Sequence, residues 1–390
     1  MRPATRAVRA GRTTDAVRDL SPALHQSSVF YAESVAEAVQ LEDMSGGVSS
    51  YTRTSNPTTM RFEGAIAELE SGEAAVATSS GMAALTLTFL TLLTPTDRVA
   101  ISPHSYADTL SVLEELSARI GFTLAVFDLS APDAHDRLAE VAATLIVVES
   151  PSNPMLRMVN LPEMAAVATR LGAKLIVDNT MATPINQRPL ELGADLVIHS
   201  ASKYLTGHHN VIGGVIVGHS ELVDRLRYMR TITGICLDPH SSWLLLQGLQ
   251  TLAIRVAAQN ATATRVAAFL SAHPGVDFVA YPSLADDVAI ANNLTGGGGV
   301  LTFGLRAGRE AITSFLESLS LCLIAVSLGG TKTLIEAPSL MSHVQGGPDN
   351  KSLSVIPENA IRLSVGLEDA QDIIDDLAAG LDPNAGKEHP

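Results

Sequence analysis

Short apolar runs alternate with helical stretches from about residue 51 to residue 218, and this alternation limits the fold more than any other feature of the chain. The runs are continuous and rich in residues that favour strands; they span 97–102, 123–128, 144–150, 174–179, 195–200 and 215–218. Strands that are apolar along their whole length indicate a mostly parallel sheet with helices on both faces. The sequence therefore predicts an α/β fold.

The rest of the chain divides around this pattern. Residues 1–50 are mixed in composition, with a helical patch at 35–41, and we expect an N-terminal arm that contributes to an oligomer. Residues 51–240 form the expected large domain. Residues 241–390 form the expected smaller α+β domain, which starts with a long helical region at 241–272. A chain of 390 residues is long enough to build both cores.

Composition and charge exclude several classes of protein. The formal net charge of −15, without any basic cluster, argues against nucleic-acid binding. The only cysteines, Cys236 and Cys322, cannot form a disulfide framework, which fits a reducing compartment. Residues 74–93 contain no charge, but their serines, threonines and glycine favour a buried helix over a membrane span. We therefore expect a cytoplasmic protein with no membrane segment.

Polar side chains stand at the ends of several predicted strands: Glu149, Asp178 and Ser200. In parallel sheets, ligands bind beyond the carboxyl ends of the strands. Lys203 follows directly, in the run HSASKYLTGHH, with Ser202 beside it. An amine, hydroxyls and a carboxylate are the parts that hold pyridoxal phosphate, through its aldehyde, its phosphate and its pyridine nitrogen. A lysine in such a site can act as both nucleophile and proton carrier.

The run SSGMAAL, residues 79–85, places a glycine directly ahead of a predicted helix. The free amides of Gly81 and Met82 would then point at an anion, helped by the helix dipole. Many helices begin with Ser-Gly as a simple cap, so the motif is weak by itself. It supports a phosphate site because Ser200 and Ser202 offer hydroxyls to the same group.

Histidines at 199, 208 and 209 surround the same lysine and invite comparison with a metal site. Their spacing matches no standard zinc motif. Because the lysine suits an organic cofactor, we predict that this site holds no metal.

Further motifs extend along the chain: YTRTSNPTT at 51–59, ESPSNP at 149–154, SLGGTKTL at 327–334 and IRLSVGLE at 361–368. With them, the chain resembles the Cys/Met-metabolism family of pyridoxal-phosphate enzymes of fold type I, from about residue 27 to residue 369. The family includes cystathionine γ-synthases, cystathionine lyases, methionine γ-lyases and O-acylhomoserine sulfhydrylases. The resemblance implies a mostly parallel, seven-stranded type of sheet between helices, a smaller C-terminal α+β domain, and a homotetramer built as a dimer of dimers.

The resemblance also implies roles for individual residues. Lys203 would carry pyridoxal 5′-phosphate, Asp178 would keep its pyridine nitrogen protonated, and Tyr106 would stack on its ring and act as acid or base at the substrate side chain. The other residues that it assigns to cofactor binding are Gly81, Met82, Asn153, Ser200 and Ser202. Taken alone, Tyr106 could equally be a packing residue. Glu149 could lie behind the site or merely end a strand, and we do not place it among the catalytic residues.

Tyr51 and Arg53 resemble the pair that this family donates to the cofactor phosphate of a neighbouring subunit, with Tyr51 also near substrate. Arg362 would clamp the substrate carboxylate bidentately, which lysine does poorly. Ser327 would help to position the substrate and Lys203. Without the resemblance, an arginine in a strand such as 361–365 would more often be a simple ion-pair partner.

Several positions depart from the relatives and bear on the substrate. Enzymes that handle cystathionine carry an arginine five residues after the stacking tyrosine and a glutamate before Ser-Leu-Gly-Gly; this chain has Ser111 and Val326 there. A second carboxylate on the substrate would find no partner, so cystathionine is disfavoured. Asp108 replaces the glycine or cysteine of relatives and would either select a cationic or hydroxyl-bearing substrate or cap a helix. Lys332 resembles the basic residue of sulfhydrylases, and Asn210 has no assigned meaning.

These observations predict γ-replacement on an activated L-homoserine derivative, with a thiol or other sulfur compound as the nucleophile. One alternative is γ-elimination like that of methionine γ-lyase, giving 2-oxobutyrate and ammonia. Another is a specialised γ-substitution with a different leaving group or a carbon nucleophile. A catalytically idle relative and an aminotransferase of the same fold are the remaining rivals.

Overall fold

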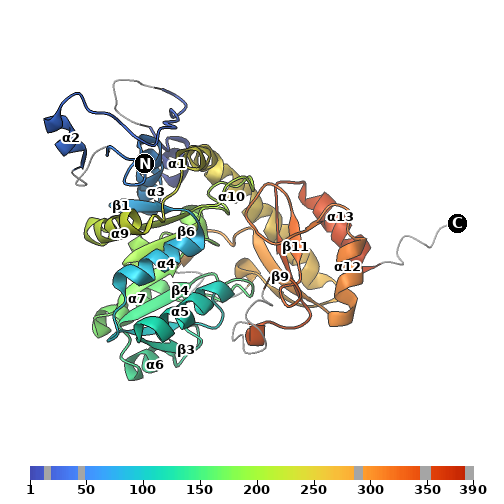
Figure 1. The fold of residues 1–390 in the computed structure, drawn as a ribbon. Helices are drawn as coiled ribbons and strands as arrows, with labels where there is room; N and C mark the ends of the chain where they lie inside the picture. Colours follow the sequence, from blue (N-terminus) through green and yellow to red (C-terminus); the bar gives the residue numbers. More distant parts are fainter. Residues whose placement is uncertain (13–18, 43–48, 285–292, 343–352, 383–390) are drawn as a thin grey trace.

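The computed structural model describes residues 1–12, 19–42, 49–284, 293–342 and 353–382. The chain forms a larger and a smaller sheet that lie side by side, and the long helix α10 (Pro239–Ala272) runs along both (Figure 1). The division that we propose near residue 240 lies in the first turn of this helix.

The larger sheet has seven strands in the order β1-β7-β6-β5-β4-β2-β3. The strands are β1 (Ala74–Thr78), β2 (Arg98–Ile101), β3 (Thr123–Val126), β4 (Leu145–Glu149), β5 (Lys174–Asp178), β6 (Leu196–Ser200) and β7 (Gly214–Gly218). All pairs from β6 to β3 are parallel, and β7 is antiparallel to both of its neighbours. The predicted α/β fold with a mostly parallel sheet is confirmed.

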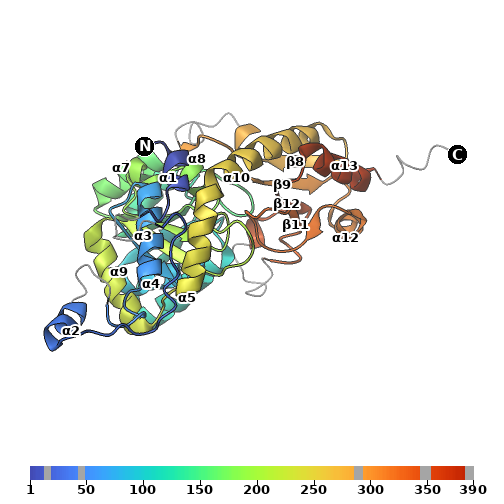
Figure 2. The same ribbon diagram turned by 90° about the horizontal axis from the view of Figure 1, so that it is seen from above.

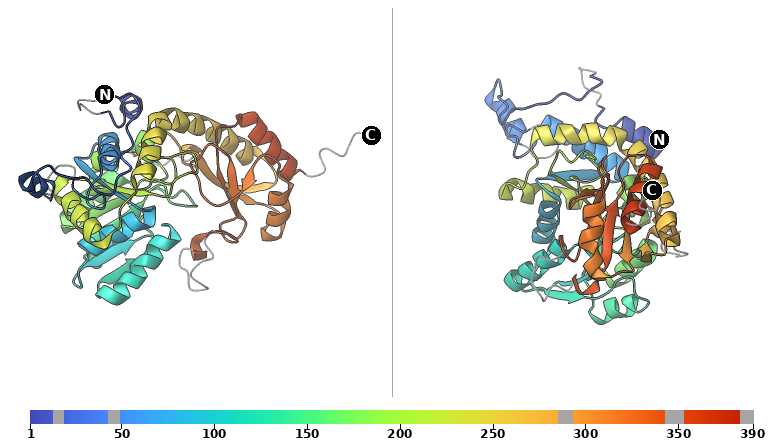
Figure 3. Two further views of the ribbon diagram at one scale, coloured as in Figure 1. Left: turned by 45° about the horizontal axis from the view of Figure 1, so that its top comes forward. Right: turned by 90° about the vertical axis from the view of Figure 1, so that its right-hand side faces the viewer.

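Helices cover both faces of this sheet because successive residues of each strand point to opposite sides. Ile176 packs toward α4 (Gly81–Leu92), α5 (Ala107–Ile120) and α9 (Ser220–Thr233). Val177, the next residue, packs on the opposite face, which is covered by α3 (Pro57–Glu70), α6 (Ala134–Glu140), α7 (Leu161–Leu171) and part of α10. The two views in Figure 3 show helices on both sides of the sheet. Short helical turns, α8 (Thr183–Asn186) and η1 (Pro189–Leu192), connect β5 to β6.

The N-terminal segment is only partly an arm. Helix α1 (Pro3–Val8) packs on α10, and its Ala7 is fully buried in the core. Helix α2 (Val35–Glu42) projects from the body of the molecule (Figure 2) and exposes Val35 and Val39.

The smaller sheet has five strands in the order β10-β11-β12-β9-β8. They are β8 (Val276–Ala280), β9 (Val300–Leu305), β10 (Leu323–Ile324), β11 (Leu334–Glu336) and β12 (Ala360–Ser364), with helical turns η2 (Pro282–Leu284), η3 (Arg309–Ala311) and η4 (Leu353–Val355) between them. The second half of α10 packs on this sheet with α12 (Ile312–Ser318) and α13 (Ala370–Leu381). The register places Glu336 opposite Arg362, and this pairing matters for the site.

The expected buried helix over 74–93 is wrong in its first part. Residues 74–78 form the edge strand β1, a turn follows, and the helix begins only at Gly81. Alanines dominate 74–78 and give little strand signal, so pairing with β7 decides the conformation there. Within the described residues, no helix combines the length and the apolar character that a membrane span requires.

Candidate functional site

A cavity of about 640 Å³ opens where the carboxyl ends of β4, β5 and β6 face the segment 325–328 ahead of β11. Of the predicted site residues, the wall of this cavity includes Gly81, Met82, Tyr106, Asn153, Asp178, Ser200, Ser202, Lys203, Val326, Ser327 and Arg362. The remaining three, Tyr51, Arg53 and Ser111, do not line it. Residues separated by nearly 300 positions in the sequence thus meet in one hollow between the two sheets.

Lys203 lies in the turn that follows β6, and its Nζ donates a hydrogen bond of 3.0 Å to the Ser327 hydroxyl. Ser327 reaches this point from a backbone with a positive φ of 89°. Burial, reinforced by the nearby charge of Arg362, lowers the pKa of Lys203 to about 8. A substantial share of this amine is therefore neutral, and so nucleophilic, close to physiological pH.

The lowered pKa makes a prediction for the protein without cofactor. The reactivity of the Lys203 amine should rise with pH and level off above about pH 8, because the neutral form dominates above its pKa. A free lysine side chain, with a pKa of about 10.4, should keep gaining reactivity to higher pH. The pH profiles of Lys203 and of a free lysine side chain can be measured together by acetylation with limiting acetic anhydride, with N-acetyl-lysine amide in the same tube as the free reference. Mass spectrometry gives the extent of acetylation of each. Identical pH profiles would contradict the prediction.

One end of the cavity suits a phosphate. Ser80 caps α4 by accepting a hydrogen bond of 3.0 Å from Ala83 N, so the amides of Gly81 and Met82 lie in the first turn, where a helix leaves its N–H groups without backbone partners. A Cβ atom at Gly81 would come within 2.7 Å of Ser200 Cβ, so only glycine lets the turn approach β6 this closely. The Ser202 hydroxyl already binds the backbone of Gly213.

The other end holds a half-buried carboxylate that suits a pyridine nitrogen. Asp178 ends β5, and its Oδ1 accepts a hydrogen bond of 2.9 Å from Thr180 N. Burial raises the pKa of Asp178, which reflects the cost of an anion without a close cation. A protonated pyridine nitrogen would remove that cost. The residues present at both ends therefore fit pyridoxal phosphate.

Glu149 contributes more than its position at a strand end indicated. It lies opposite Asp178 in the sheet register and accepts hydrogen bonds from the backbone amides of Tyr106, at 2.6 Å, and Asn153, at 3.1 Å. Burial and the neighbouring Asp178 raise the pKa of Glu149 well above its ordinary value. Glu149 is therefore a positioning residue for the two loops that carry Tyr106 and Asn153.

Arg362 is held by a partner that the sequence did not reveal. Its Nη2 lies 2.8 Å from Glu336 Oε1, and both side chains are almost fully buried. Nη1 donates to Asn153 Oδ1 at 3.0 Å, and Nη2 also donates to the Ser327 carbonyl at 2.7 Å. The buried Nε has no hydrogen-bond partner among the described residues. Only the pairing of β11 with β12 brings Glu336 to this position.

Tyr106 and Asp108 form a pair at the start of α5. The phenol of Tyr106 donates a hydrogen bond of 2.9 Å to Asp108 Oδ2. Tyr106 itself occupies the N-cap position, so the alternative in which Asp108 caps this helix is wrong. Burial first, and the Asp108 carboxylate second, raise the pKa of Tyr106 and keep the phenol protonated. One turn further on, the Ser111 hydroxyl donates to the Ala107 carbonyl at 3.1 Å and faces its own helix.

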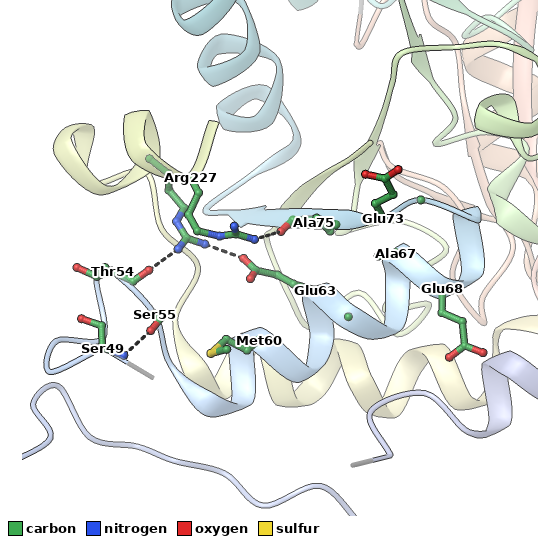
Figure 4. A pocket seen from close by; sticks show the side chains of 14 residues that line it. Ser49, Thr54, Ser55, Met60, Glu63, Ala67, Glu68, Glu73, Ala75 and Arg227 are labelled. Atoms are coloured by element: carbon green, nitrogen blue, oxygen red, sulfur yellow. Dashed lines mark hydrogen bonds and ion pairs between the residues drawn. The ribbon is translucent and has the colours of Figure 1, made fainter. Parts of the chain in front are cut away.

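The segment that carries Tyr51 and Arg53 lies beside a second cavity of about 520 Å³, shown in Figure 4. Arg230 anchors this segment: its guanidinium donates to Glu63 at 2.6 Å and to the Thr54 carbonyl at 2.5 Å. Arg53 donates to the Thr231 carbonyl of α9. Tyr51 is 44% exposed, and neither Tyr51 nor Arg53 lines the cavity that holds Lys203 in the same chain.

Comparison with known proteins identifies the family of the chain. Residues 4–382 match the family described as Cys/Met metabolism PLP-dependent enzyme. The chain is 36% identical over 385 residues to an L-methionine gamma-lyase of Fusobacterium nucleatum subsp. polymorphum, with 97% of both chains covered. It is 37% identical over 383 residues to the O-succinylhomoserine sulfhydrylase of Pseudomonas aeruginosa, covering 97% of this chain and 94% of the relative. The crystal structure of cystathionine gamma synthase from Xanthomonas oryzae pv. oryzae, in complex with aminoacrylate and cysteine, matches with a TM-score of 0.92, 34% identity and 98% of both chains covered.

Proposed function

Because the chain belongs to the Cys/Met-metabolism family of pyridoxal-phosphate-dependent enzymes, we propose that it catalyses γ-replacement, in which a sulfur nucleophile displaces the γ-substituent of an activated L-homoserine derivative. The family makes the chain an enzyme with pyridoxal 5′-phosphate as its cofactor. The observation that carries the finer proposal is the cavity shared by Lys203, Tyr106 and Arg362, in whose wall no other described lysine or arginine lies.

Each residue has a distinct task in this proposal. When bound, pyridoxal phosphate supplies a conjugated ring that withdraws electrons from the substrate and makes its Cα and Cβ protons acidic. Lys203 holds the cofactor at rest and then moves protons at Cα and at Cβ through its Nζ. Asp178 keeps the pyridine nitrogen protonated, and Arg362 binds the substrate carboxylate. The Tyr106 phenol hydrogen-bonds to the departing γ-substituent and gives it a proton where the substituent needs one.

The side-chain end of the cavity argues against a substrate with a second carboxylate. Val326, which is 53% exposed, lines the cavity. Among the described residues that line the cavity, the basic ones are Lys203, His209 and Arg362. In this proposal Lys203 serves the cofactor and Arg362 binds the α-carboxylate, and burial lowers the pKa of His209, which disfavours its cationic form. A second carboxylate enclosed without a partner costs free energy. Cystathionine is therefore a poor substrate in this proposal.

A second candidate function is γ-elimination to 2-oxobutyrate and ammonia. It is supported by the 36% identity to a protein named L-methionine gamma-lyase, a value close to that for the sulfhydrylase. Elimination and replacement share the same early proton transfers. They differ in whether the species formed when the γ-substituent leaves is attacked by a nucleophile or is released and hydrolysed by water. The residues that line the cavity serve either outcome.

A panel of amino acids tests the proposal and separates these outcomes. Purified enzyme would receive O-acetylhomoserine, methionine, cystathionine or S-adenosylmethionine, each with and without a thiol, and the products would be identified by mass spectrometry. We expect a thioether product from O-acetylhomoserine only when thiol is present. Formation of 2-oxobutyrate without any thioether would favour elimination. Cystathionine as the best substrate would overturn the specificity argument.

The exposed Tyr51 and Arg53 lead us to propose that two chains complete each other's sites, within a homotetramer arranged as a dimer of dimers. Helix α9 and Arg230 hold this segment on the outer surface, where a second copy of the chain can meet it. The exposed guanidinium of Arg53 would then bind the cofactor phosphate of the neighbour.

This arrangement predicts that Arg53→Ala lowers the affinity for pyridoxal phosphate by roughly 10- to 100-fold, the value of a charge-assisted hydrogen bond. Arg225→Ala removes another exposed arginine and should leave the affinity unchanged. Equilibrium titration of the apo forms measures both. In mixed oligomers, Arg53→Ala and Lys203→Ala subunits should rebuild some intact sites and regain activity. Unchanged affinity together with no regain of activity would exclude shared sites.

A further inference from the structure

Asp108 is a carboxylate without a task in the proposed reaction, although it lies one hydrogen bond from the cavity. The Tyr106 phenol lines that cavity and donates to Asp108 Oδ2 at 2.9 Å. The motif reads YADT and places this carboxylate two residues after the tyrosine.

The contact cannot be explained by the helix alone. Tyr106 is the N-cap residue of α5, and no side chain caps that end. Asp108 lies in the first helical turn, where an acidic residue interacts favourably with the helix dipole wherever its side chain points. Its carboxylate is instead turned toward the phenol at the cavity wall.

Among the described residues, the basic side chains that line the cavity are Lys203, His209 and Arg362, and none of them forms an ion pair with Asp108. Arg362 is paired with Glu336. In the proposed function, Lys203 and Asp178 are engaged with the cofactor. The phenol of Tyr106 is neutral, since burial and the carboxylate both favour its protonated form. The negative charge of Asp108 therefore acts on whatever group the phenol touches.

We propose that Asp108 sets the charge preference for the γ-substituent of the substrate, favouring a cationic group over a neutral one and a neutral group over an anionic one. This inference rests on the proposed function, which places the γ-substituent against the Tyr106 phenol. An unscreened carboxylate about 6 Å away, across one hydrogen bond, changes the affinity for a unit charge by roughly 10- to 100-fold at the effective dielectric of a protein site.

Binding of two amino acids of the same shape that do not release a γ-substituent tests the proposal in the holoenzyme. L-2,4-diaminobutyrate and L-norvaline differ only in a terminal ammonium or methyl group at the position of the leaving atom. Their dissociation constants would be read from the change in cofactor absorbance. In Asp108→Asn, which keeps an oxygen for the phenol but loses the charge, we expect the preference for diaminobutyrate over norvaline to fall by roughly 10-fold or more.

A matched control separates a local charge from the general field of the protein. Glu115 lies on the same helix but is 70% exposed and paired with Arg119, so Glu115→Gln should leave the preference unchanged. An unchanged preference in Asp108→Asn would overturn the proposal. A fall in the preference for diaminobutyrate in Asp108→Gly but not in Asp108→Asn would also overturn the proposal, because space or hydrogen bonding rather than charge would then set the preference.

Turnover distinguishes failure of this inference from failure of the proposed function. S-methylmethionine and ethionine have the same number of heavy atoms, but only the first carries a sulfonium. The ratio of their kcat/KM values should fall in Asp108→Asn in step with the binding preference. Absence of γ-products from every substrate would reject the proposed function, while the binding preference would still decide the role of Asp108.

Discussion

Lys203→Ala is expected to lower kcat by roughly 10³-fold or more, because one amine both attaches the cofactor and moves protons at Cα and Cβ. The geometry behind this expectation is a half-buried amine held 3.0 Å from Ser327 Oγ on the wall of the cavity, with a pKa lowered to about 8. Borohydride reduction followed by peptide mass spectrometry should find the reduced cofactor on the peptide that contains Lys203 in the wild type, and none there in the variant.

Lys174→Ala is the matched control, since Lys174 is half exposed and paired with Asp195 at the start of β5. It should retain full activity and cofactor attachment. Added ethylamine, which fits the space left by the side chain, should restore part of the proton transfer in Lys203→Ala. Wild-type activity in Lys203→Ala, or attachment of the cofactor at another lysine, would contradict the assignment.

Arg362→Met should have two separable effects. It should lower kcat/KM by roughly 100-fold through loss of the charged hydrogen bonds to the substrate carboxylate. It should also destabilise the protein by about 3–5 kcal/mol, because Glu336, which is 0% exposed, would keep a buried charge without its partner. Chemical denaturation at saturating cofactor and steady-state kinetics measure the two effects independently.

The double variant Arg362→Met/Glu336→Met distinguishes the two roles of the arginine. Replacing both members of a buried ion pair by apolar residues is often neutral for stability. Most of the lost stability should therefore return, while kcat/KM should remain low. Recovery of kcat/KM in the double variant would show that Arg362 acts only as the partner of Glu336. Unchanged stability in the single variant would contradict the buried ion pair.

The strands of the large sheet could be predicted where their residues are apolar and β-branched. The run 174–179 is apolar and β-branched, and it forms β5 at Lys174–Asp178. Edge strand β1 was missed because Ala74–Thr78 is rich in alanine, and its conformation depends on pairing with β7, a tertiary effect. Strand ends then indicated the site, since parallel strands bring Asp178 and Ser200 to one edge.

The contacts within the site could not be predicted in the same way. The pair of Arg362 with Glu336 depends on the register of two short strands, which no local pattern reports. The contact of Tyr106 with Asp108 depends on where α5 begins, because Tyr106 lies at the N-cap with a non-helical backbone and residues two apart within a helix do not face each other. The resemblance to a known family identified the residues of the site, whereas their hydrogen-bond and ion-pair partners could be identified only from the folded structure.

Hydrogen exchange at Cβ tests the central claim most directly, because γ-chemistry requires proton removal there. L-norvaline, which has no leaving group, would be incubated with the holoenzyme in D₂O, recovered and examined by proton NMR. We predict loss of signal at both Cα and Cβ in the wild type and at neither carbon in Lys203→Ala. Exchange confined to Cα would contradict γ-replacement and γ-elimination alike, and would indicate a reaction that ends at Cα.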